Sequence, residues 1–293
     1  MNRIGVDWGS TSLRAYLYAR DGTVAEQRSD RRGIRFVTAG DFEAVLREFL
    51  AGWLLPGSKV ALSGMVTSRN GWVETPYVDC PARLEDLSKS LLTRRVADAE
   101  LVFVPGLCRR GPEPDVMRGE ETQLLGLDPA GDRERIVVMP GTHSKWVLLR
   151  QGRIESFRTC MTGELYELLL AHSLIGRIAE GVDFSEAAFV AGAERGHASA
   201  TPVSDLFGAR AGVLTASMRA GDVAAYLSGL LVGNEIREGI AAFGAPAGPI
   251  EIVGARLLGE RYAQALRQLG LSCRIAREDV AARGLWRVLE AVR

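Results

Sequence analysis

The chain has 293 residues, 47% hydrophobic and 25% charged, with 36 acidic and 36 basic side chains in balance. Such a length can bury a substantial core in one or two domains. The balanced charge gives no long-range field that would favour nucleic acid or an anionic membrane as a partner, and no run approaches the roughly 18 apolar residues that span a bilayer.

The four cysteines are widely spaced and form no CxxC pair. Because the chain has only three histidines, it offers no evident structural zinc site, and we expect reduced thiols. The amino terminus enters a strand pattern without the features of a signal peptide. Together these observations predict a cytoplasmic protein.

Strand and helix patterns alternate in the first part of the chain. We expect three consecutive strands at 4–8, 13–18 and 23–26, a helix from Asp41, buried strands at 59–65 and 100–106, and a helix at 118–127. Asp41 is a plausible helix cap, and the "RDG" at 20–22 is typical of a hairpin turn.

The same order of elements then begins again. We expect a strand at 135–141, a hairpin at 145–159, helices at 163–175, 185–195, 203–219 and 222–243, a strand at 250–255, a helix at 257–269, a short strand at 272–276 and a closing helix at 278–292. This repetition predicts two similar α/β halves, with a ligand cleft between them.

A hydroxyl-rich turn follows the first strand. It contains Asp7, Gly9, Ser10, Thr11 and Ser12 in the segment "DWGSTS". Successive backbone amides in such a turn can bind phosphate oxygens, and the carboxylate can hold a Mg²⁺ ion that bridges the phosphates. Taken alone, the segment also fits a β-turn capped by its own side chains.

A second turn of this kind follows the strand that opens the second half. It supplies Gly141, Thr142, His143, Ser144 and Lys145. The lysine could neutralise a phosphate as a point charge, whereas we expect the histidine to form hydrogen bonds or pack rather than act as a base. Two such turns in two repeated halves are more specific than either alone and predict a bound nucleotide.

Two adjacent acids, Glu120 and Glu121, stand between the turns at the start of a predicted helix. One interpretation is a charged first turn that favours the helix dipole. The other is a general base that accepts the proton of an acceptor hydroxyl.

The order of these motifs resembles the actin/hexokinase/Hsp70 ATPase superfamily, with two phosphate motifs joined by a connecting helix and followed by an adenosine motif. The resemblance implies two ribonuclease H-like α/β domains flanking a central cleft, with ATP and Mg²⁺ bound. It favours Glu120, which directly follows Gly119, as the base. The chain has Glu where the sugar kinases of that superfamily usually have Asp, and this departure leaves Glu121 open.

More narrowly, "DWGSTSLRAYL", "SGMVTSRNGWVETPYVDCPA", "MRGEETQLLG", "PGTHSKWV" and "MTGELYELL" together resemble the 2-dehydro-3-deoxygalactonokinase family over most of the chain. The resemblance implies ATP-dependent phosphorylation of the 6-hydroxyl of 2-dehydro-3-deoxy-D-galactonate in galactose catabolism.

The stretch 63–81 fits a sugar-acid site, because it combines hydroxyl, aromatic and guanidinium groups. The guanidinium suits a carboxylate through its two-pronged geometry. A polar surface loop would have a similar composition. The substrate-binding candidates are Ser63, Thr67, Ser68, Arg69, Trp72 and Tyr77 from this stretch, with Arg158, Thr162 and Glu164 from the second half and Arg14 held open between this site and a surface ion pair.

Small residues mark the expected adenine site. Gly254 and Ala255 follow a predicted strand, and their small size permits a close approach of the backbone to a ligand. An ordinary strand-to-helix turn is the alternative.

We expect residues 1–126 to form a domain that binds the sugar acid and carries the first phosphate site. Residues 127–293 are expected to form the nucleotide-binding domain, and the last helix, 278–292, can pack back on the first domain. Rival functions are an exopolyphosphatase-like hydrolase and a nucleotide-switched binding protein. The partner is expected to be a small molecule. A homodimer fits the apolar helix faces as well as a monomer does.

Overall fold

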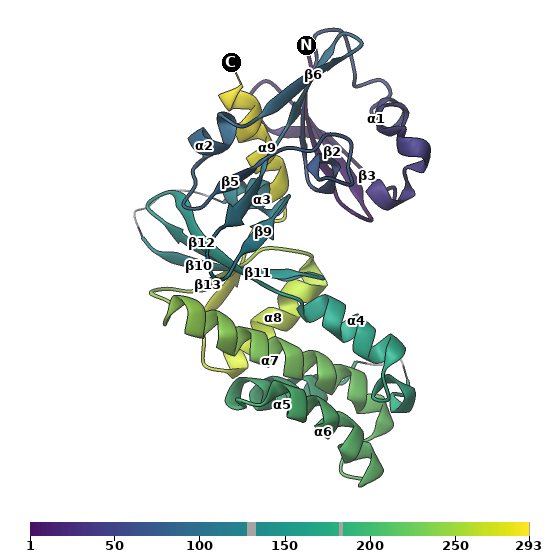
Figure 1. Ribbon diagram of the computed structural model, residues 1–293, viewed down its shortest axis with the longest axis vertical. Coiled ribbons are helices and arrows are strands. Elements are labelled where there is room, and N and C mark those ends of the chain that lie inside the picture. The colour runs from purple at the N-terminus through teal and green to yellow at the C-terminus, as the bar shows by residue number, and fades with distance from the viewer. Residues whose placement is uncertain (128–132, 182–183, 293) are drawn as a thin grey trace. The chain divides into compact units, whose positions relative to one another are not determined.

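Figure 1 shows the computed structural model, which describes residues 1–127, 133–181 and 184–292. The chain divides into two compact units. Unit 1 comprises Met1–Asp132, Arg150–Ser156 and Arg277–Arg293, and unit 2 comprises Arg133–Leu149 and Phe157–Ala276. Each unit has a sheet of its own. The functional division predicted at 126/127 stays a prediction.

The main sheet of unit 1 has six strands in the order β3-β2-β1-β4-β7-β6. These are β1 (Arg3–Trp8), β2 (Leu13–Tyr18), β3 (Val24–Asp30), β4 (Lys59–Ser63), β6 (Leu92–Val96) and β7 (Ala99–Phe103). Strand β1 pairs antiparallel with β2 and parallel with β4, with Asp7 opposite Ser63. The carboxyl ends of β1 and β4 therefore lie side by side, which is where ligands bind in sheets of this kind.

Short helices and a small sheet complete unit 1. They are α1 (Phe42–Phe49), α2 (Leu84–Ser88), α3 (Glu120–Gly126), α9 (Val280–Ala291) and the three-stranded sheet of β5 (Tyr77–Asp79), β8 (Gly106–Arg109) and β9 (Asp115–Met117). Single-turn helices include η1 (Ile34–Phe36) and η3 (Met65–Thr67). The last helix, α9, packs against α3, β1 and β4, so the end of the chain lies in the same unit as its start.

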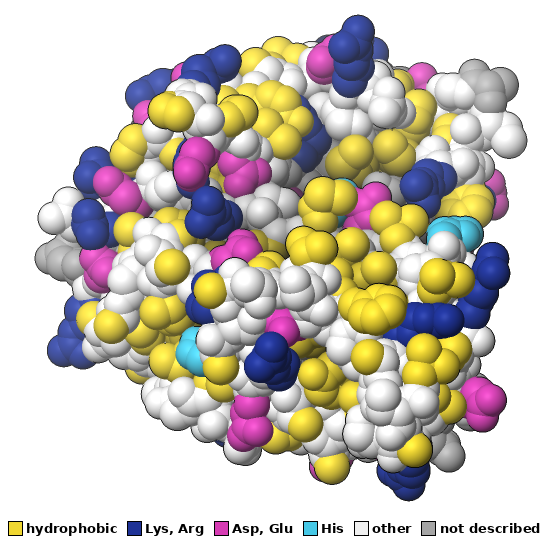
Figure 2. Space-filling model, turned by 60° about the horizontal axis from the view of Figure 1, so that its bottom comes forward, with side chains coloured by type: hydrophobic (Ala, Val, Ile, Leu, Met, Phe, Trp, Pro, Cys, Tyr) yellow, Lys and Arg dark blue, Asp and Glu magenta, His cyan; other side chains and the backbone are white. Residues whose placement is uncertain are grey.

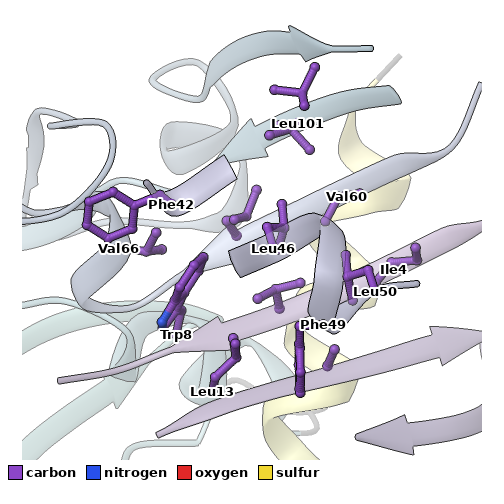
Figure 3. Close-up of a cluster of buried hydrophobic side chains, with 14 of the residues drawn as sticks. Ile4, Trp8, Leu13, Phe42, Leu46, Phe49, Leu50, Val60, Val66 and Leu101 are labelled. Atoms are coloured by element: carbon purple, nitrogen blue, oxygen red, sulfur yellow. The ribbon is translucent and has the colours of Figure 1, made fainter. Parts of the chain in front are cut away.

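One core cluster of unit 1 lies between its sheet and α1, as Figure 3 shows, and a second lies between the sheet and α9. The side chain of Asp41 accepts a hydrogen bond from Ala44 N, which confirms the predicted cap. Phe42, Leu46 and Phe49 then recur at helical spacing and are buried against the sheet. This packing fixes the strands whose ends carry the first turn.

Unit 2 repeats the strand order of unit 1. Its five-stranded sheet has the order β12-β11-β10-β13-β14, which matches the β3-β2-β1-β4-β7 portion of the first sheet. Its strands are β10 (Arg135–Met139), β11 (Ser144–Arg150), β12 (Arg153–Cys160), β13 (Ile250–Ile252) and β14 (Cys273–Ile275). The prediction of two ribonuclease H-like α/β units is confirmed.

The helices of unit 2 are α4 (Thr162–His172), α5 (Glu186–Ala198), α6 (Pro202–Leu214), α7 (Val223–Phe243) and α8 (Arg256–Gln268). Helices α5 and α7 lie in direct backbone contact at Gly192, Gly196, Gly229 and Gly233. A Cβ atom on Gly229 would lie 1.9 Å from the carbonyl oxygen of Phe189. Only glycine permits this approach of α5 to α7.

The surface of the protein reflects the balanced charge of its sequence. Charged side chains of both signs are interspersed with hydrophobic ones on the face that Figure 2 views. Among the described residues, no helix is both long and apolar enough to span a membrane. All four cysteines are free thiols.

Candidate active site

The first predicted turn joins β1 to β2 and is held from outside by backbone groups. Within it, Gly9 N donates to Ser12 O over 2.9 Å. From the segment at η1, Ile34 N donates to Gly9 O over 3.0 Å and Arg35 N to Ser10 O over 3.2 Å. The carbonyl groups of Gly9 and Ser10 are therefore bound by a neighbouring segment, and the amides of Ser10, Thr11 and Ser12 take no part in these hydrogen bonds.

Those amides are available to an anion. The backbone N–H groups of Ser10, Thr11 and Ser12 donate no hydrogen bond to any residue that the structure describes. Gly33 lies so close that a Cβ atom on it would be 2.2 Å from Thr11 N. The turn thus presents successive donors from a tightly packed support, as a phosphate-binding nest requires.

Asp7 lies near the end of β1, beside the first turn. It is paired across the sheet with Arg14 on β2 and Ser63 on β4. Burial raises the pKa of the Asp7 carboxyl, the negative charge of Glu120 raises it further, and Arg14 partly offsets both. Asp7 and Glu120 are thus close enough to repel, and a cation between them would lower the free energy of both ionised groups.

Glu120 begins α3 beside the same strand ends. Its carboxylate accepts a hydrogen bond from Arg118 N over 3.0 Å, and its side chain is half-buried. The preceding residue, Gly119, has φ of +108°, a conformation that favours glycine. A Cβ atom on Gly119 would lie 3.2 Å from the Cα atom of Gly64, which follows β4. This contact places the start of α3 at the carboxyl end of β4.

Glu121 points the other way, into the interior. It is fully buried, and its two oxygens accept hydrogen bonds from Ser63 Oγ at 3.1 Å and from Gly119 N at 2.6 Å. Burial, and then the charge of Glu120, raise the pKa of Glu121 to about 8. Ser63 Oγ also lies 3.0 Å from Thr122 Oγ1. Both Glu121 oxygens and the Ser63 hydroxyl are thus engaged within unit 1.

The sequence did not single out Arg118, which secures the stretch 63–81. One guanidinium nitrogen donates to Thr67 O at 2.7 Å and Thr67 Oγ1 at 2.9 Å, and the other donates to Thr75 O at 3.1 Å. The Thr75 hydroxyl is a further partner. The guanidinium also lies 4.4 Å from the centre of the Tyr77 ring. The only signal for this role in the sequence was the position of Arg118, directly before "GEE".

The other predicted residues of this stretch differ in exposure. Arg69 is exposed, whereas Ser68 is buried and its hydroxyl donates to Met65 O over 2.7 Å. The half-buried Trp72 ring lies 6.2 Å from that of Phe42 and packs against the core of unit 1. Arg69 and Tyr77 are therefore the side chains of this stretch best placed to meet a ligand.

The second predicted turn joins β10 to β11. Gly141 N lies 3.4 Å from Ser144 Oγ, and the backbone amides of Thr142 and His143 donate no hydrogen bond within the described parts of the chain. The Lys145 side chain is buried, and its ammonium group donates to His143 O over 2.9 Å. The available donors of this turn are thus backbone amides, as in unit 1.

The start of α4 lies against the second turn. Glu164 N donates to Thr142 O over 3.0 Å, and the Glu164 carboxylate lies 2.5 Å from His143 Nε2. A Cβ atom on Gly163 would lie 2.5 Å from Gly141 O. Glu164, predicted to bind the sugar acid, therefore contacts the turn predicted to bind the nucleotide. Its substrate role stays a prediction.

The predicted adenine site lies beside the same turn. Gly254 and Ala255 are exposed residues between β13 and α8. Because β10 and β13 are parallel, their carboxyl ends are adjacent, and a Cβ atom on Gly254 would lie 3.3 Å from Pro140 O. Arg158 is half-buried on β12 of the same unit, and Thr162 begins α4, where its hydroxyl donates to buried Glu235.

The donor set suits Mg²⁺ held together with phosphates. In the ranges that the structure describes, no three His, Cys, Asp or Glu side chains gather as a metal cluster. Mg²⁺ in phosphoryl-transfer sites usually takes only one or two carboxylates from the protein, and the rest of its shell comes from phosphates and water. Asp7, beside the free amides of the first turn, fits that pattern.

Comparison with known sequences identifies a family. A sequence model of 2-keto-3-deoxy-galactonokinase matches residues 7–288. The chain is 37% identical over 285 residues to the probable 2-dehydro-3-deoxygalactonokinase of Rhizobium meliloti (strain 1021), covering 95% of this chain and 93% of that protein. It is 38% identical over 279 residues to the 2-dehydro-3-deoxygalactonokinase of Escherichia coli (strain K12), covering 95% and 94%.

Comparison with solved structures agrees. A crystal structure from Sinorhizobium meliloti, named as a 2-dehydro-3-deoxygalactonokinase protein, matches with a TM-score of 0.91 and 36% identity, over 99% of this chain and 98% of that one. The activator of the 2-hydroxyisocaproyl-CoA dehydratase from Clostridium difficile, solved with ADPNP, matches with a TM-score of 0.53 and 14% identity, over 99% and 96%. The second likeness concerns the fold alone.

Proposed function

The chain belongs to the 2-keto-3-deoxy-galactonokinase family, and we propose that it transfers the γ-phosphoryl group of ATP to the 6-hydroxyl of 2-dehydro-3-deoxy-D-galactonate. The family match over residues 7–288 is the observation that carries this proposal. It includes both turns and both acids, and the substrate is taken from the names of the relatives.

On the nucleotide side, we assign phosphate binding to the amides of Thr142 and His143 in unit 2. These donors have no partner among the described residues, and their turn is supported by α4. Gly254 and Ala255 leave room at the adjacent strand end for the adenosine part of ATP. Lys145 adds positive charge behind the turn, although its ammonium group is bonded to the turn itself.

On the acceptor side, Glu120 is the general base and accepts the proton of the attacking hydroxyl. Its side chain is half-buried at the strand ends, whereas Glu121 is fully buried with both oxygens engaged. Glu121 and Ser63 are therefore positioning residues that hold the start of α3. This burial difference supports the choice of Glu120 over Glu121.

We assign the first turn and Asp7 to binding the phosphoryl group that is transferred. The amides of Ser10, Thr11 and Ser12 donate to phosphate oxygens, and Asp7 holds Mg²⁺ directly or through water. Mg²⁺ held by Asp7 would supply positive charge that offsets the charge of the phosphates. Most of the catalysis in this reaction class comes from such positioning and charge stabilisation rather than covalent chemistry.

The sugar acid is recognised by the stretch 63–81. Arg69 is exposed and can bind the substrate carboxylate with two parallel hydrogen bonds. Tyr77 presents an exposed aromatic ring that is fixed on its other face by Arg118. Buried Thr67 and Ser68 support this stretch, so we assign them to its conformation rather than to ligand contact.

A coupled ADP-release assay over a panel of sugar acids and sugars tests the proposal. We expect rapid release with 2-dehydro-3-deoxy-D-galactonate, slower release with the gluconate epimer, and none without an acceptor. Release of inorganic phosphate without any sugar would instead support the hydrolase. Slow ATP turnover that no sugar acid accelerates would support the nucleotide-switched binding protein.

Location and assembly complete the proposal. Four free thiols agree with a reducing compartment, and we propose the cytoplasm. A homodimer stays a prediction. The exposed apolar side chains of α6, among them Val203 and Phe207, are where a disruptive charge would be introduced to test it by sedimentation.

A further inference from the structure

A buried carboxylate lies behind the second turn. Glu235 on α7 is only 2% exposed. Its Oε1 atom accepts a hydrogen bond from Trp146 Nε1 over 2.9 Å, and its Oε2 atom accepts one from the Tyr262 hydroxyl over 2.7 Å and another from Thr162 Oγ1. The carboxylate thus joins β11, α4, α7 and α8 at one point within unit 2.

The directions of these hydrogen bonds are fixed by chemistry. An indole N–H can only donate, so Trp146 donates to Glu235. Burial raises the pKa of the Glu235 carboxyl, whereas the hydrogen bonds from Thr162, Tyr262 and Trp146 lower it and favour the ionised form that accepts them. Burial and the nearby charge of Glu235 raise the pKa of Tyr262 well above its usual value, so its hydroxyl keeps its proton and donates it to Glu235. A phenol has one proton, and the oxygen of Tyr262 is left as an acceptor.

Ser144 completes this chain of hydrogen bonds. Its Oγ atom lies 3.1 Å from the Tyr262 hydroxyl, and since Tyr262 donates to Glu235, Ser144 must donate to Tyr262. Gly141 O is a longer alternative acceptor at 3.4 Å, and a hydrogen bond from Ser144 also lowers the pKa of Glu235. The Ser144 hydroxyl is therefore directed at the buried Tyr262 and Glu235.

The surrounding packing makes this arrangement rigid. A Cβ atom on Gly239, one turn further along α7, would lie 2.2 Å from the Trp146 ring. The indole is thus held between α7 and β11 with its N–H directed at Glu235. Hydrogen bonds in such a dry interior are costly to leave unmade, so each partner constrains the next.

We propose that Glu235 is a positioning residue that orients the second phosphate turn through Tyr262 and Ser144. The inference rests on the proposed function of that turn in holding ATP. It changes the role predicted for Ser144. This side chain anchors the turn from behind, and the amides of Thr142 and His143 meet the phosphates.

Tyr262→Phe is the primary test, because it removes one hydroxyl and little volume. We expect the Kd of a non-hydrolysable ATP analogue, measured by isothermal titration calorimetry, to rise roughly threefold to tenfold, the range for loss of one buried hydrogen bond. The KM for ATP should rise by the same factor. In contrast, kcat and the KM for the sugar acid should change less than about twofold, which is the size of effect expected for a substitution that does not touch their determinants.

Tyr166→Phe is the matched control. Tyr166 lies on α4 in the same unit, is half-buried, and its hydroxyl has no hydrogen-bond partner in the described ranges. It should leave the Kd of the analogue unchanged. An equal rise in both variants would overturn the proposal, because it would show a general effect of hydroxyl loss. A fall in kcat with an unchanged Kd in Tyr262→Phe would do the same.

Ser144→Ala gives a second, independent reading. If Ser144 acts through Tyr262, the double variant should bind the analogue no more weakly than the weaker single variant. If the losses of affinity of the two single variants multiply in the double variant, Ser144 does not act through Tyr262 and the proposal is overturned. If the wild type binds ATP normally and Tyr262→Phe does too, the inference fails while the proposed function stands. If the wild type binds no ATP at all, both fail.

Discussion

The two turns occupy the same place in two sheets of the same strand order, yet they are held differently. In unit 1, backbone amides of Ile34 and Arg35 bind the carbonyls of the turn. In unit 2, the backbone amide of Glu164 likewise binds Thr142 O, and side chains add a second support, with Ser144, Tyr262 and Glu235 in one chain of hydrogen bonds. The strand order fixes where a turn lies, but not what secures it.

This difference has a functional consequence. A backbone-held turn depends on the course of the chain, so substitutions of its side chains disturb its shape little. A turn held by side chains depends on particular hydroxyl and carboxyl groups. Unit 1 has its carboxylates beside the turn, at Asp7 and Glu120, and unit 2 has its buried carboxylate behind the turn, at Glu235. We therefore expect unit 1 to supply the general base and the metal ligand, and unit 2 to bind the nucleotide.

The largest expected effect tests the acid side. Glu120→Gln should lower kcat by about 100-fold or more, the usual scale for loss of a general base. Glu121→Gln should retain most activity, because the buried side chain only positions α3. Steady-state kinetics with ATP and the sugar acid measure both variants. The reverse ranking would move the base to Glu121.

Asp7→Asn tests the metal assignment. The amide keeps the size of the side chain but removes its charge, so the Mg²⁺ concentration for half-maximal turnover should rise by at least about tenfold, the scale of weakened metal sites. A Mg²⁺ titration of the ADP-release assay measures this shift. Asp98→Asn, at an exposed position, is the control. An unchanged Mg²⁺ requirement would remove Asp7 from this role.

Two glycines test the supports of the turns directly. A Cβ atom would lie 2.2 Å from Thr11 N in Gly33→Ala and 2.5 Å from Gly141 O in Gly163→Ala. Each variant should lower the free energy of unfolding by about 1–3 kcal/mol through overpacking. Urea denaturation measures it. Gly208→Ala on α6 meets no atom within 4 Å and should be neutral or stabilising. Equal free energies of unfolding in all three variants would show that the turns accommodate the added Cβ atom without cost.

The smallest expected effect is a pH dependence of stability from Glu121. Its pKa is about 8 in the folded protein against 4.5 for a free side chain, so the folded state binds a proton that the unfolded state has lost in this interval. Its stabilising contribution is therefore complete below about pH 4.5 and declines as pH rises toward 8. Between pH 6 and 7, wild type should lose about 1.4 kcal/mol relative to Glu121→Gln. Parallel pH profiles would contradict the burial of a protonated acid.

The sequence predicted the repeated architecture well, because long apolar runs and periodic helices define it. The strand at 13–18 and the helix cap at Asp41 were correct to the residue. The elements between 77 and 117 were not predicted in full, because β5, α2 and β9 have three to five residues, too few to show a period. The third strand extends to Asp30 through a polar edge segment, "EQRSD", that alternation does not reveal.

The sequence indicated those residues of the candidate site that adjoin along the chain, whose roles stay predictions, and did not indicate those that are distant in sequence. Both turns and the two acids form local motifs, and the structure places the turns at the ends of paired strands and the acids at the start of α3. Glu235 lies 89 residues from its partner Trp146, and Arg118 lies 51 from Thr67. One signal for Glu235 existed: it is one of two acids on α7, with Glu238, and lies between the apolar Val232 and Ile236. A single sequence cannot pair such residues across the fold.

The division of labour between the turns can be measured most directly by calorimetric titration of ATP into Glu120→Gln and Gly163→Ala. The account predicts that Glu120→Gln binds ATP as wild type does, while Gly163→Ala, whose added Cβ atom disturbs Gly141, binds it several-fold more weakly. Weak binding by Glu120→Gln together with normal binding by Gly163→Ala would contradict it.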